Sequence, residues 1–172
     1  TCLGYAAGGG ISTGQYNTSV GLVSMTGAVY TGNYNLSLGY AAVPAAVDTS
    51  GQCTLGDSNI ADLRCNDQSI AALSDERDKT NIVDSPYGLA FINSTKPRQF
   101  LWDARDANVK NGSTRLGFIA QELLVAADGN NDVLNLVMED NPEKLEAKYG
   151  NLLPIMVKAI QELSAKNDAL EA

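Results

Sequence analysis

An apolar residue followed by glycine recurs at a nearly constant interval along the first third of the chain. The intervals are 17, 18 and 17 residues, and the four pairs are Leu3-Gly4, Val20-Gly21, Leu38-Gly39 and Leu55-Gly56. Two of the pairs follow copies of one longer motif, TGQYNTS at residues 13–19 and TGNYNLS at residues 31–37. A period of this length predicts a stack of similar units, because one unit alone cannot bury its apolar face.

The residues between these pairs predict short strands joined by tight turns. Valine, leucine, threonine and tyrosine alternate with glycine and asparagine, which fits strands of about five residues and turns with positive φ, and we expect no helix there. Such units are completed either by other chains, as in an intertwined trimeric β-helix or β-prism, or by stacking within one chain, as in a monomeric β-solenoid. The motif NTSVG, followed by NLSLGYAA, resembles the repeats of trimeric viral fibres and trimeric bacterial adhesin heads, and it favours the intertwined trimer.

The composition changes sharply near residue 74. Residues 1–73 hold 11 of the 16 glycines but only five charged residues, whereas residues 74–172 hold the other 27 charged residues. This contrast predicts two domains: a repetitive β fibre stalk at 1–73, and a small α+β domain at 74–172 whose core is expected to include Phe100, Trp102 and Phe118. Because the chain starts with threonine and shows no signal peptide, we interpret it as a piece of a longer protein with an upstream fibre segment.

The absence of histidine excludes several classes of catalytic site. It removes the Ser-His-Asp triad, the Cys-His dyad and histidine-ligated zinc, so a serine nucleophile needs another base. Three cysteines without a CxxC pair, Cys2, Cys53 and Cys65, are expected to be small buried residues, and we expect neither a metal nor a cofactor. The net charge of −8 argues against nucleic acid as a partner, and no apolar run is long enough for membrane insertion.

Four sequence blocks follow one another in the second domain. They read LSDERDKTNI at residues 73–82, QFLW at 99–102, LGFIAQE at 116–122, and YGNLLP at 149–154 leading into AIQEL at 159–163. Together they closely resemble the intramolecular chaperone domain of phage tail fibres and tailspikes, the self-cleaving peptidase S74 family. The resemblance implies a domain that trimerises, drives folding of the fibre upstream, and then cuts itself off near its own first residue. It also implies a place in the virion, after folding in the host cytoplasm.

The pattern SDxRxK implies a catalytic pair, in which Ser74 is the nucleophile and Lys79 is the base. By the same resemblance, the supporting residues are Asp75, Arg77, Gln121 and Glu122. A lysine acts as a base only after it loses its proton, which burial or a nearby cation such as Arg77 favours. Side chains five residues apart lie on opposite faces of a strand and about 140° apart on a helix. The pair therefore requires either a bend in the chain or a lysine from a neighbouring subunit.

Two peptide bonds at this junction are candidates for cleavage. Ser74 can reach the carbonyl before it, at the Leu73-Ser74 bond, through a five-membered ring in an N-to-O acyl shift. Attack on the Ser74-Asp75 bond would pass through a strained four-membered ring, unless the serine of another subunit acts there. Both bonds remain candidates.

The C-terminal residues carry a heptad pattern. Spacings of three and four residues predict a helix at about 152–172 that begins near Pro154, with a seam formed by Leu153, Met156, Ile160, Leu163, Asn167 and Leu170. Such a seam indicates packing against helices of other copies, and its polar Asn167 fixes the register. The seam is too short to define the number of strands, so the homotrimer follows from the family and the repeats. An amphipathic helix lying on its own domain is the alternative.

The favoured interpretation is the C-terminal part of a phage tail fibre or tailspike. Its stalk would be folded by a trimerising domain that releases itself through one serine-dependent cut per chain. The alternative is a receptor-binding fibre tip, in which the tyrosine-rich stalk binds a host surface glycan or protein and the second domain is a permanent trimer clamp. The two interpretations differ in whether the chain is cut.

Overall fold

The computed structural model describes residues 1–67, 69–103, 105 and 112–171. The contacts within the chain divide it into two units. One comprises Thr1–Leu63, Leu101–Arg115 and Glu139–Leu145, and the other comprises Arg64–Phe100, Leu116–Met138 and Glu146–Ala172. Two parts are described separately below: the repeat segment, residues 1–63, and the C-terminal domain, the described residues between 87 and 171. Every described residue from 59 to 86 is exposed, and the predicted boundary at residue 74 falls within this stretch.

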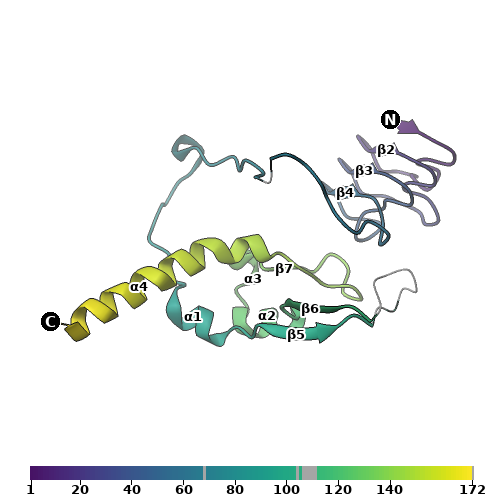
Figure 1. The fold of residues 1–172 in the computed structure, drawn as a ribbon. Coiled ribbons are helices and arrows are strands. Elements are labelled where there is room, and N and C mark those ends of the chain that lie inside the picture. The colour runs from purple at the N-terminus through teal and green to yellow at the C-terminus, as the bar shows by residue number, and fades with distance from the viewer. Residues whose placement is uncertain (68, 104, 106–111, 172) are drawn as a thin grey trace. The chain divides into compact units, whose positions relative to one another are not determined.

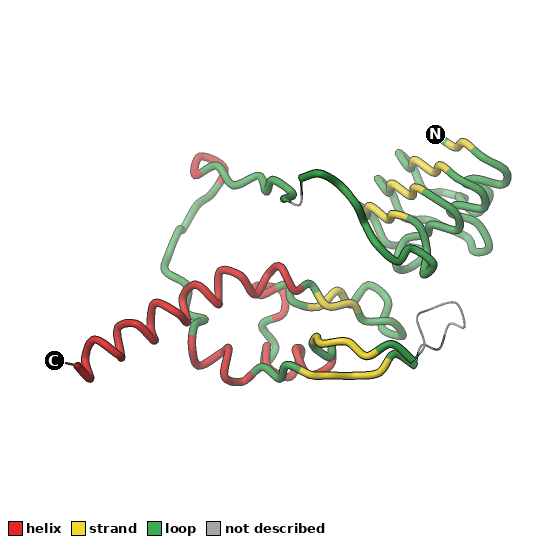
Figure 2. The backbone as a smooth tube through the Cα atoms, in the orientation of Figure 1, coloured by secondary structure: helices red, strands yellow, loops and turns green. Residues whose placement is uncertain are grey.

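The repeat segment forms a four-stranded parallel sheet with one strand per repeat (Figures 1 and 2). The strands are β1 (Cys2–Leu3), β2 (Thr18–Val20), β3 (Leu36–Leu38) and β4 (Cys53–Leu55), hydrogen-bonded in sequence order. Their registers pair residues one period apart, so that a single column contains Cys2, Ser19, Ser37 and Thr54. Each repeat is therefore one coil stacked on the coil before it.

This arrangement corrects the expectation of an intertwined trimer. Each strand finds its hydrogen-bonding neighbours in the same chain, as in the β-solenoid alternative, and no exchange of strands between chains is needed to complete the ladder. The strands contain two or three residues, fewer than the sequence predicted. The reason is that each coil bends sharply after its strand, at the glycine that follows the apolar residue of the repeat.

The repeated glycines allow the backbones of successive coils to approach closely. Gly4, Gly21 and Gly39 have φ values of 129°, 128° and 115°, which confirms turns with positive φ. A Cβ atom placed on Gly21 would lie 2.4 Å from the carbonyl oxygen of Gly39, a distance that no side chain tolerates. The spacing of the repeat thus reflects a steric requirement that recurs once per coil.

Asparagine side chains join the coils on the inside of the stack. The Asn17 Oδ1 atom accepts a hydrogen bond from the Asn35 backbone N–H at 2.8 Å, and Asn35 Oδ1 accepts one from the Gln52 backbone N–H at 3.0 Å. Both asparagines are buried. Each amide group satisfies a backbone group of the next coil, so these side chains stabilise the stack alongside the buried apolar residues Met25, Tyr30 and Ala42.

The three cysteines are exposed, which makes the expectation of buried cysteines wrong. Cys53 lies on the outer side of β4, where side chains alternate with the inward Thr54. Cys2 belongs to the inward column, but it lies in the outermost described coil and no described coil covers it. Cys65 lies in the exposed stretch after the repeats.

The C-terminal domain is a small α+β domain, as predicted. It contains α1 (Leu89–Ser94), a sheet of β5 (Arg98–Leu101) and β6 (Thr114–Gly117), α2 (Ala120–Ala127) and α3 (Asn131–Leu134). The antiparallel strands β7 (Val137–Met138) and β8 (Glu146–Ala147), the short 3-10 helix η2 (Tyr149–Leu152) and the long helix α4 (Leu153–Glu171) complete it. Helix α4 matches the C-terminal helix predicted at 152–172, of which residue 172 lies outside the described residues. Among the described residues, no helix has both the length and the hydropathy to cross a membrane.

Aliphatic side chains and one aromatic ring form the core of this domain. Its buried residues are Phe91, Leu123, Ala127, Leu134, Leu136, Val137, Leu152, Ile155 and Ala159. The aromatic core predicted from the sequence is only partly correct, because Trp102 is 41% exposed while Phe100 and Phe118 are half-buried. Phe118 instead packs edge-to-face on Tyr149, with ring centroids 5.5 Å apart, at the margin of the domain.

A buried hydroxyl in the repeat segment leads to a first prediction. The Ser19 hydroxyl donates to the Ser24 Oγ atom at 2.7 Å, but the buried Ser37 hydroxyl has no hydrogen-bond partner among the described residues. One period after Ser24 the chain has Ala42, which offers no hydroxyl. Ser37→Ala should raise the free energy of unfolding by about 1 kcal/mol, because it removes an unsatisfied polar group.

The matched control is Ser19→Ala, which should lower the same free energy by about 1 kcal/mol because it removes the hydrogen bonds that the buried Ser19 hydroxyl donates to the Ser24 carbonyl and Oγ. Urea unfolding followed by circular dichroism measures both variants. Equal losses in the two variants would contradict the assignment of Ser37 as unsatisfied.

Candidate functional site

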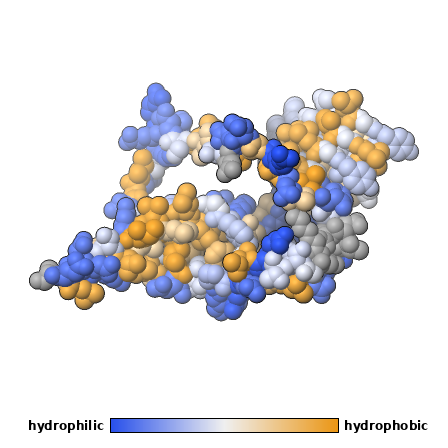
Figure 3. Space-filling model, viewed as in Figure 1, coloured by the Kyte–Doolittle hydropathy of each residue, from blue (hydrophilic) through white to orange (hydrophobic). Residues whose placement is uncertain are grey.

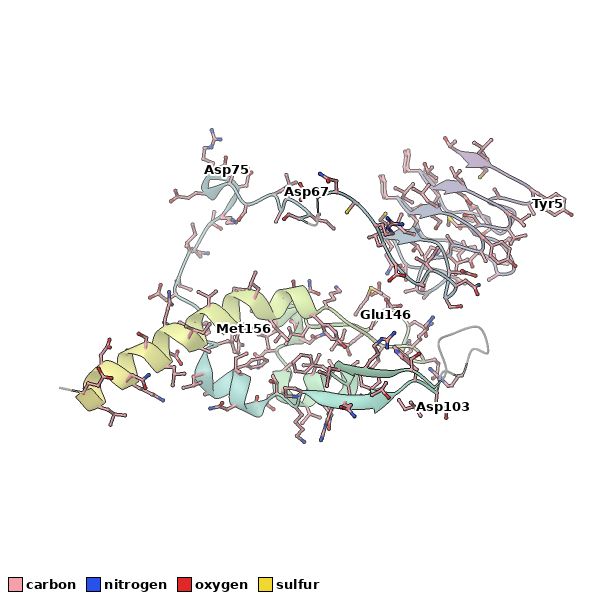
Figure 4. The ribbon with its side chains drawn as sticks, in the orientation of Figure 1. Tyr5, Asp67, Asp75, Asp103, Glu146 and Met156 are labelled. Carbon is pink, nitrogen blue, oxygen red and sulfur yellow. The ribbon has the colours of Figure 1, made fainter. Side chains whose placement is uncertain are left out.

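Ser74 and Lys79 flank a single turn of 3-10 helix, η1 (Glu76–Asp78). Asp75 caps this turn, because its carboxylate accepts a hydrogen bond from the Arg77 backbone N–H at 2.9 Å. After the turn, Lys79 returns to an extended conformation with φ −127° and ψ 148°. Residues 73–79 are called the serine–lysine turn below, and Figure 4 shows Asp75 on it.

The turn brings the two predicted catalytic side chains together within one chain. The Nζ atom of Lys79 donates a hydrogen bond to the Oγ atom of Ser74 at 2.5 Å. A separation of five residues prevents this contact in a regular strand or helix, and η1 supplies the bend that the sequence analysis required. The distance lies within the reach needed for direct proton transfer between a nucleophile and its base.

Arg77 is paired with Asp75 rather than directed at Lys79. Its guanidinium donates to both carboxylate oxygens of Asp75, from Nε at 3.0 Å and from Nη2 at 2.6 Å. These side-chain hydrogen bonds, with the backbone N–H of Arg77, lower the pKa of Asp75 below its ordinary value. Arg77 therefore holds the turn closed through Asp75, which differs from the role of a free nearby cation that its position in the sequence suggested.

The serine–lysine turn is exposed to water along its whole length. Leu73 is fully exposed, and every residue from Ser74 to Lys79 is also exposed. The contact between the serine and the lysine is thus complete in one chain, while the described residues of that chain do not enclose it. Among the described residues, none shields the pair from water.

Gln121 and Glu122 lie in the first turn of α2. The Glu122 carboxylate forms an ion pair with Arg98, with Oε1 2.5 Å from Nη2, and Gln121 is exposed. The side-chain hydrogen bond from Arg98 is the main cause that lowers the pKa of Glu122, and the charge of Lys96 adds to it. The structure thus pairs Glu122 with β5, and it gives this carboxylate a partner other than Ser74 or Lys79.

Helix α4 has one buried face and one exposed apolar face. Ile155 and Ala159 are each 5% exposed, and α4 packs against α1. The predicted seam lies elsewhere on the helix and is exposed at every position, namely Leu153, Met156, Ile160, Leu163, Asn167 and Leu170. Figure 3 shows hydrophobic residues along the surface that α4 forms. The helix does lie on its own domain, but not through its seam.

One contact in this domain was not anticipated from the sequence. The Glu162 Oε2 atom on α4 accepts a hydrogen bond from the Leu89 backbone N–H at 2.8 Å and so caps α1. The two residues are 73 positions apart, and no local motif connects them. The only sequence signal is Gly88, since a side chain at this position would collide with the Glu162 carboxylate.

Fold and site together define a small α+β domain that follows a serine–lysine turn and ends in a helix with an exposed seam. Residues 74–129 match the family model Peptidase_S74, which is described as the chaperone of endosialidase. The match covers about a third of the chain, begins at Ser74 itself and supports an S74 chaperone domain there. The family implies a chaperone role in a phage tail protein and a place in the virion. Searches of curated proteins and of solved structures gave no significant match.

The pairing of Asp75 with Arg77 predicts a measurable titration. The pKa of Asp75 is lower in the folded turn than in an unfolded chain, so the ionised carboxylate stabilises the turn. This stabilisation is fully present above about pH 4, and it is lost as the pH falls through the lower pKa of the folded state. In an uncleavable Ser74→Ala chain, the NMR titration midpoint of the Asp75 carboxyl should lie below the ordinary value. Arg77→Ala should raise this midpoint towards about 3.9.

The matched control is Arg115→Ala, which removes an arginine that donates to the Thr114 carbonyl instead. This control should leave the Asp75 midpoint where it is. A midpoint that stays low in Arg77→Ala would show that the guanidinium is not the cause of the shift.

Proposed function

We propose that this chain is the C-terminal part of a phage tail fibre or tailspike, and that its S74 domain assembles three chains, promotes folding of the β repeats and then releases itself. Ser74 is the nucleophile of a single self-cleavage per chain, and Lys79 is its base. The observation that carries this proposal is the 2.5 Å contact between Lys79 Nζ and Ser74 Oγ at the first residue of the family match.

The chemistry at the Leu73-Ser74 bond follows from this geometry. The Ser74 Oγ atom attacks the Leu73 carbonyl carbon while its proton passes to the neutral amine of Lys79. The C–N bond then breaks, and Lys79 returns the proton to the departing amine of Ser74. Water hydrolyses the resulting ester, which leaves a carboxylate on Leu73 and restores the serine hydroxyl. At the Ser74-Asp75 bond, the same steps require the serine of a neighbouring subunit.

Exposure of the pair in one chain favours control of this reaction by assembly. Burial or a nearby cation favours the neutral form of a lysine. In one chain Arg77 is paired with Asp75, and the described residues do not enclose Lys79. Neighbouring subunits packed around the serine–lysine turn would supply that enclosure. Cleavage would then follow trimer formation, as a folding checkpoint requires.

The repeat segment gives a reason for a chaperone. Its strands have two or three residues, and most of its buried side chains are small or polar, such as Ser19 and Ser37, with Met25 and Tyr30 as the larger ones. Each coil must therefore be ordered at a large cost in backbone entropy before it gains much from burial. A domain that holds three copies together raises their effective concentration to about the millimolar range, which favours contacts between the repeat segments.

The exposed seam of α4 supports association of the S74 domains. Leu153 and Ile160 are both 65% exposed, and a row of apolar side chains at heptad spacing packs well against equivalent helices. The proposed partners are two further copies of this chain, together with the upstream fibre segment of the same chain.

A second candidate function rests on the exposed tyrosines of the repeat segment. Tyr16 and Tyr34 are 71% and 65% exposed, and their rings stack on each other with centroids 4.9 Å apart. An exposed aromatic pair offers a flat apolar surface with polar hydroxyls, which suits contact with a host surface glycan or protein. In that case the S74 domain would act as a permanent clamp, and the chain would stay intact.

The cleavage proposal predicts the behaviour of two variants. Wild-type chain should give two fragments by mass spectrometry, whereas Ser74→Ala should remain a full-length trimer of 18.1 kDa chains. Lys79→Arg keeps the positive charge but cannot act as a base, so its cleavage should stop while assembly persists. The masses of the wild-type fragments also show which of the two bonds is cut.

Lys166→Arg is the matched control, because it makes the same change at an exposed position on α4. It should be cleaved like wild type. Normal cleavage in Lys79→Arg, or cleavage of Ser74→Ala at the same bond, would contradict the assigned roles. An intact wild-type chain would favour the permanent clamp.

The chaperone proposal predicts that the repeats depend on the S74 domain during folding. After denaturation, Ser74→Ala chain should refold to a trimer, whereas residues 1–73 alone should aggregate or stay unfolded. A full-length chain with Ile160→Asp and Leu163→Asp should resemble the isolated repeats, because charges buried in the seam oppose association. Light scattering measures the trimer recovered, and equal yields from all three would show that the domain is no chaperone for the repeats.

A further inference from the structure

The C-terminal half of α4 extends beyond its contacts with the rest of the domain. Ile155 and Ala159 are its buried residues, Glu162 is half-buried, and every residue from 163 to 171 is exposed. In Figure 1 this end of the helix projects past α1. A helical stretch shorter than about 12 residues is marginal in water without partners. In a single chain, we therefore expect the end of α4 to fray back towards Glu162.

Glu162 occupies the last turn of α4 that contacts the domain. Its Oε2 atom accepts the hydrogen bond from the Leu89 N–H at 2.8 Å, and α1 has no side-chain cap of its own. The carboxylate fits only because residue 88 is glycine. A Cβ atom on Gly88 would lie 2.4 Å from the Glu162 Oε1 atom. Fraying that reached Glu162 would remove this cap from α1.

The start of α1 is also where the exposed stretch carrying the serine–lysine turn becomes anchored. Residues 80–86 are exposed, whereas Tyr87 is half-buried and Gly88 is buried. The Tyr87 ring packs edge-to-face on Phe91 of α1, with centroids 5.7 Å apart. The start of α1 therefore holds one end of the exposed stretch that leads to Lys79 and Ser74.

We infer that Glu162 couples assembly at the seam to the placement of the serine–lysine turn. Packing of Leu163 and Leu170 against other copies holds the end of α4 helical, which keeps Glu162 on Leu89 and fixes the anchor of the exposed stretch. Helix α1 has two states, one with and one without the hydrogen bond from Leu89 to Glu162, and assembly shifts the balance towards the first. Glu162 is a positioning residue, and its link to self-cleavage rests on the proposed function.

The first test measures this coupling without any cleavage. In Ser74→Ala chains, hydrogen exchange at the Leu89 amide should be about tenfold faster in Glu162→Ala, which loses a hydrogen bond to a charged group. Leu163→Asp, which disrupts the seam, should accelerate the same amide to a similar extent. Both substitutions remove the same hydrogen bond between Glu162 and the Leu89 N–H. The Leu89 amide of the double variant should therefore exchange little faster than that of either single variant.

Two further variants sharpen this test. Glu162→Gln keeps an acceptor oxygen and should restore much of the protection, whereas Gln161→Ala, at the neighbouring exposed position, should leave Leu89 unchanged. The inference is wrong if Leu163→Asp dissociates the trimer without affecting Leu89. It is also wrong if the effects of Glu162→Ala and Leu163→Asp multiply, or if Glu162→Gln exchanges as fast as Glu162→Ala.

The second test asks whether the coupling reaches the reaction. In chains with Ser74 intact, Glu162→Ala should lower the cleavage rate per assembled trimer at least about fivefold, while Glu162→Gln and Gln161→Ala stay close to wild type. An unchanged rate per trimer, or a loss that only follows the loss of trimer, overturns the positioning role. If wild-type chain itself is not cleaved, the proposed self-cleavage fails, and the exchange experiment alone decides the coupling.

Discussion

The close approach of backbones at the repeated glycines is the constraint on which the repeat segment depends. Gly21 and Gly39 contact each other across successive coils, and this contact leaves no room for a Cβ atom. The coils enclose mainly small or polar side chains such as Ser19 and Ser37, with Met25 and Tyr30 as larger buried residues, so hydrogen bonds between coils supplement a small apolar core. A segment built in this way gains little from early collapse, and its association with a chaperone domain has a physical reason.

The period of the sequence predicted the register of the repeats but not which chain completes each strand. A spacing of 17 or 18 residues fits both an intertwined trimer and a single-chain stack, since each pairs equivalent residues. The expectation of buried cysteines was wrong because successive side chains of a strand point to opposite sides. In β4, Thr54 points inward, so its neighbour Cys53 points outward. The heptad spacing on α4 corresponds to an exposed, mainly apolar face of the helix, and the packing of this face against other copies stays a prediction.

In the candidate site too, the sequence predicted which residues take part but not all of the contacts between them. The motif identified Ser74 and Lys79, but their contact depends on η1, a turn that Asp75 and Arg77 close between them. A linear pattern indicates that four residues act together without showing which of them touch. The contact between Glu162 and Leu89 could not be predicted, because packing of two helices brings these positions together.

Because every coil makes equivalent contacts with the next, the repeat segment can change its length by whole coils. Each coil presents to the next the same glycine and the same strand register. Gain or loss of one whole period would therefore preserve every column and alter the height by about 4.8 Å, the spacing between neighbouring strands. Coils of 17 and of 18 residues both keep the columns aligned, so a difference of one residue is absorbed within a coil. The length of the repeat segment can therefore evolve in steps of one coil, while the domain that follows stays unchanged.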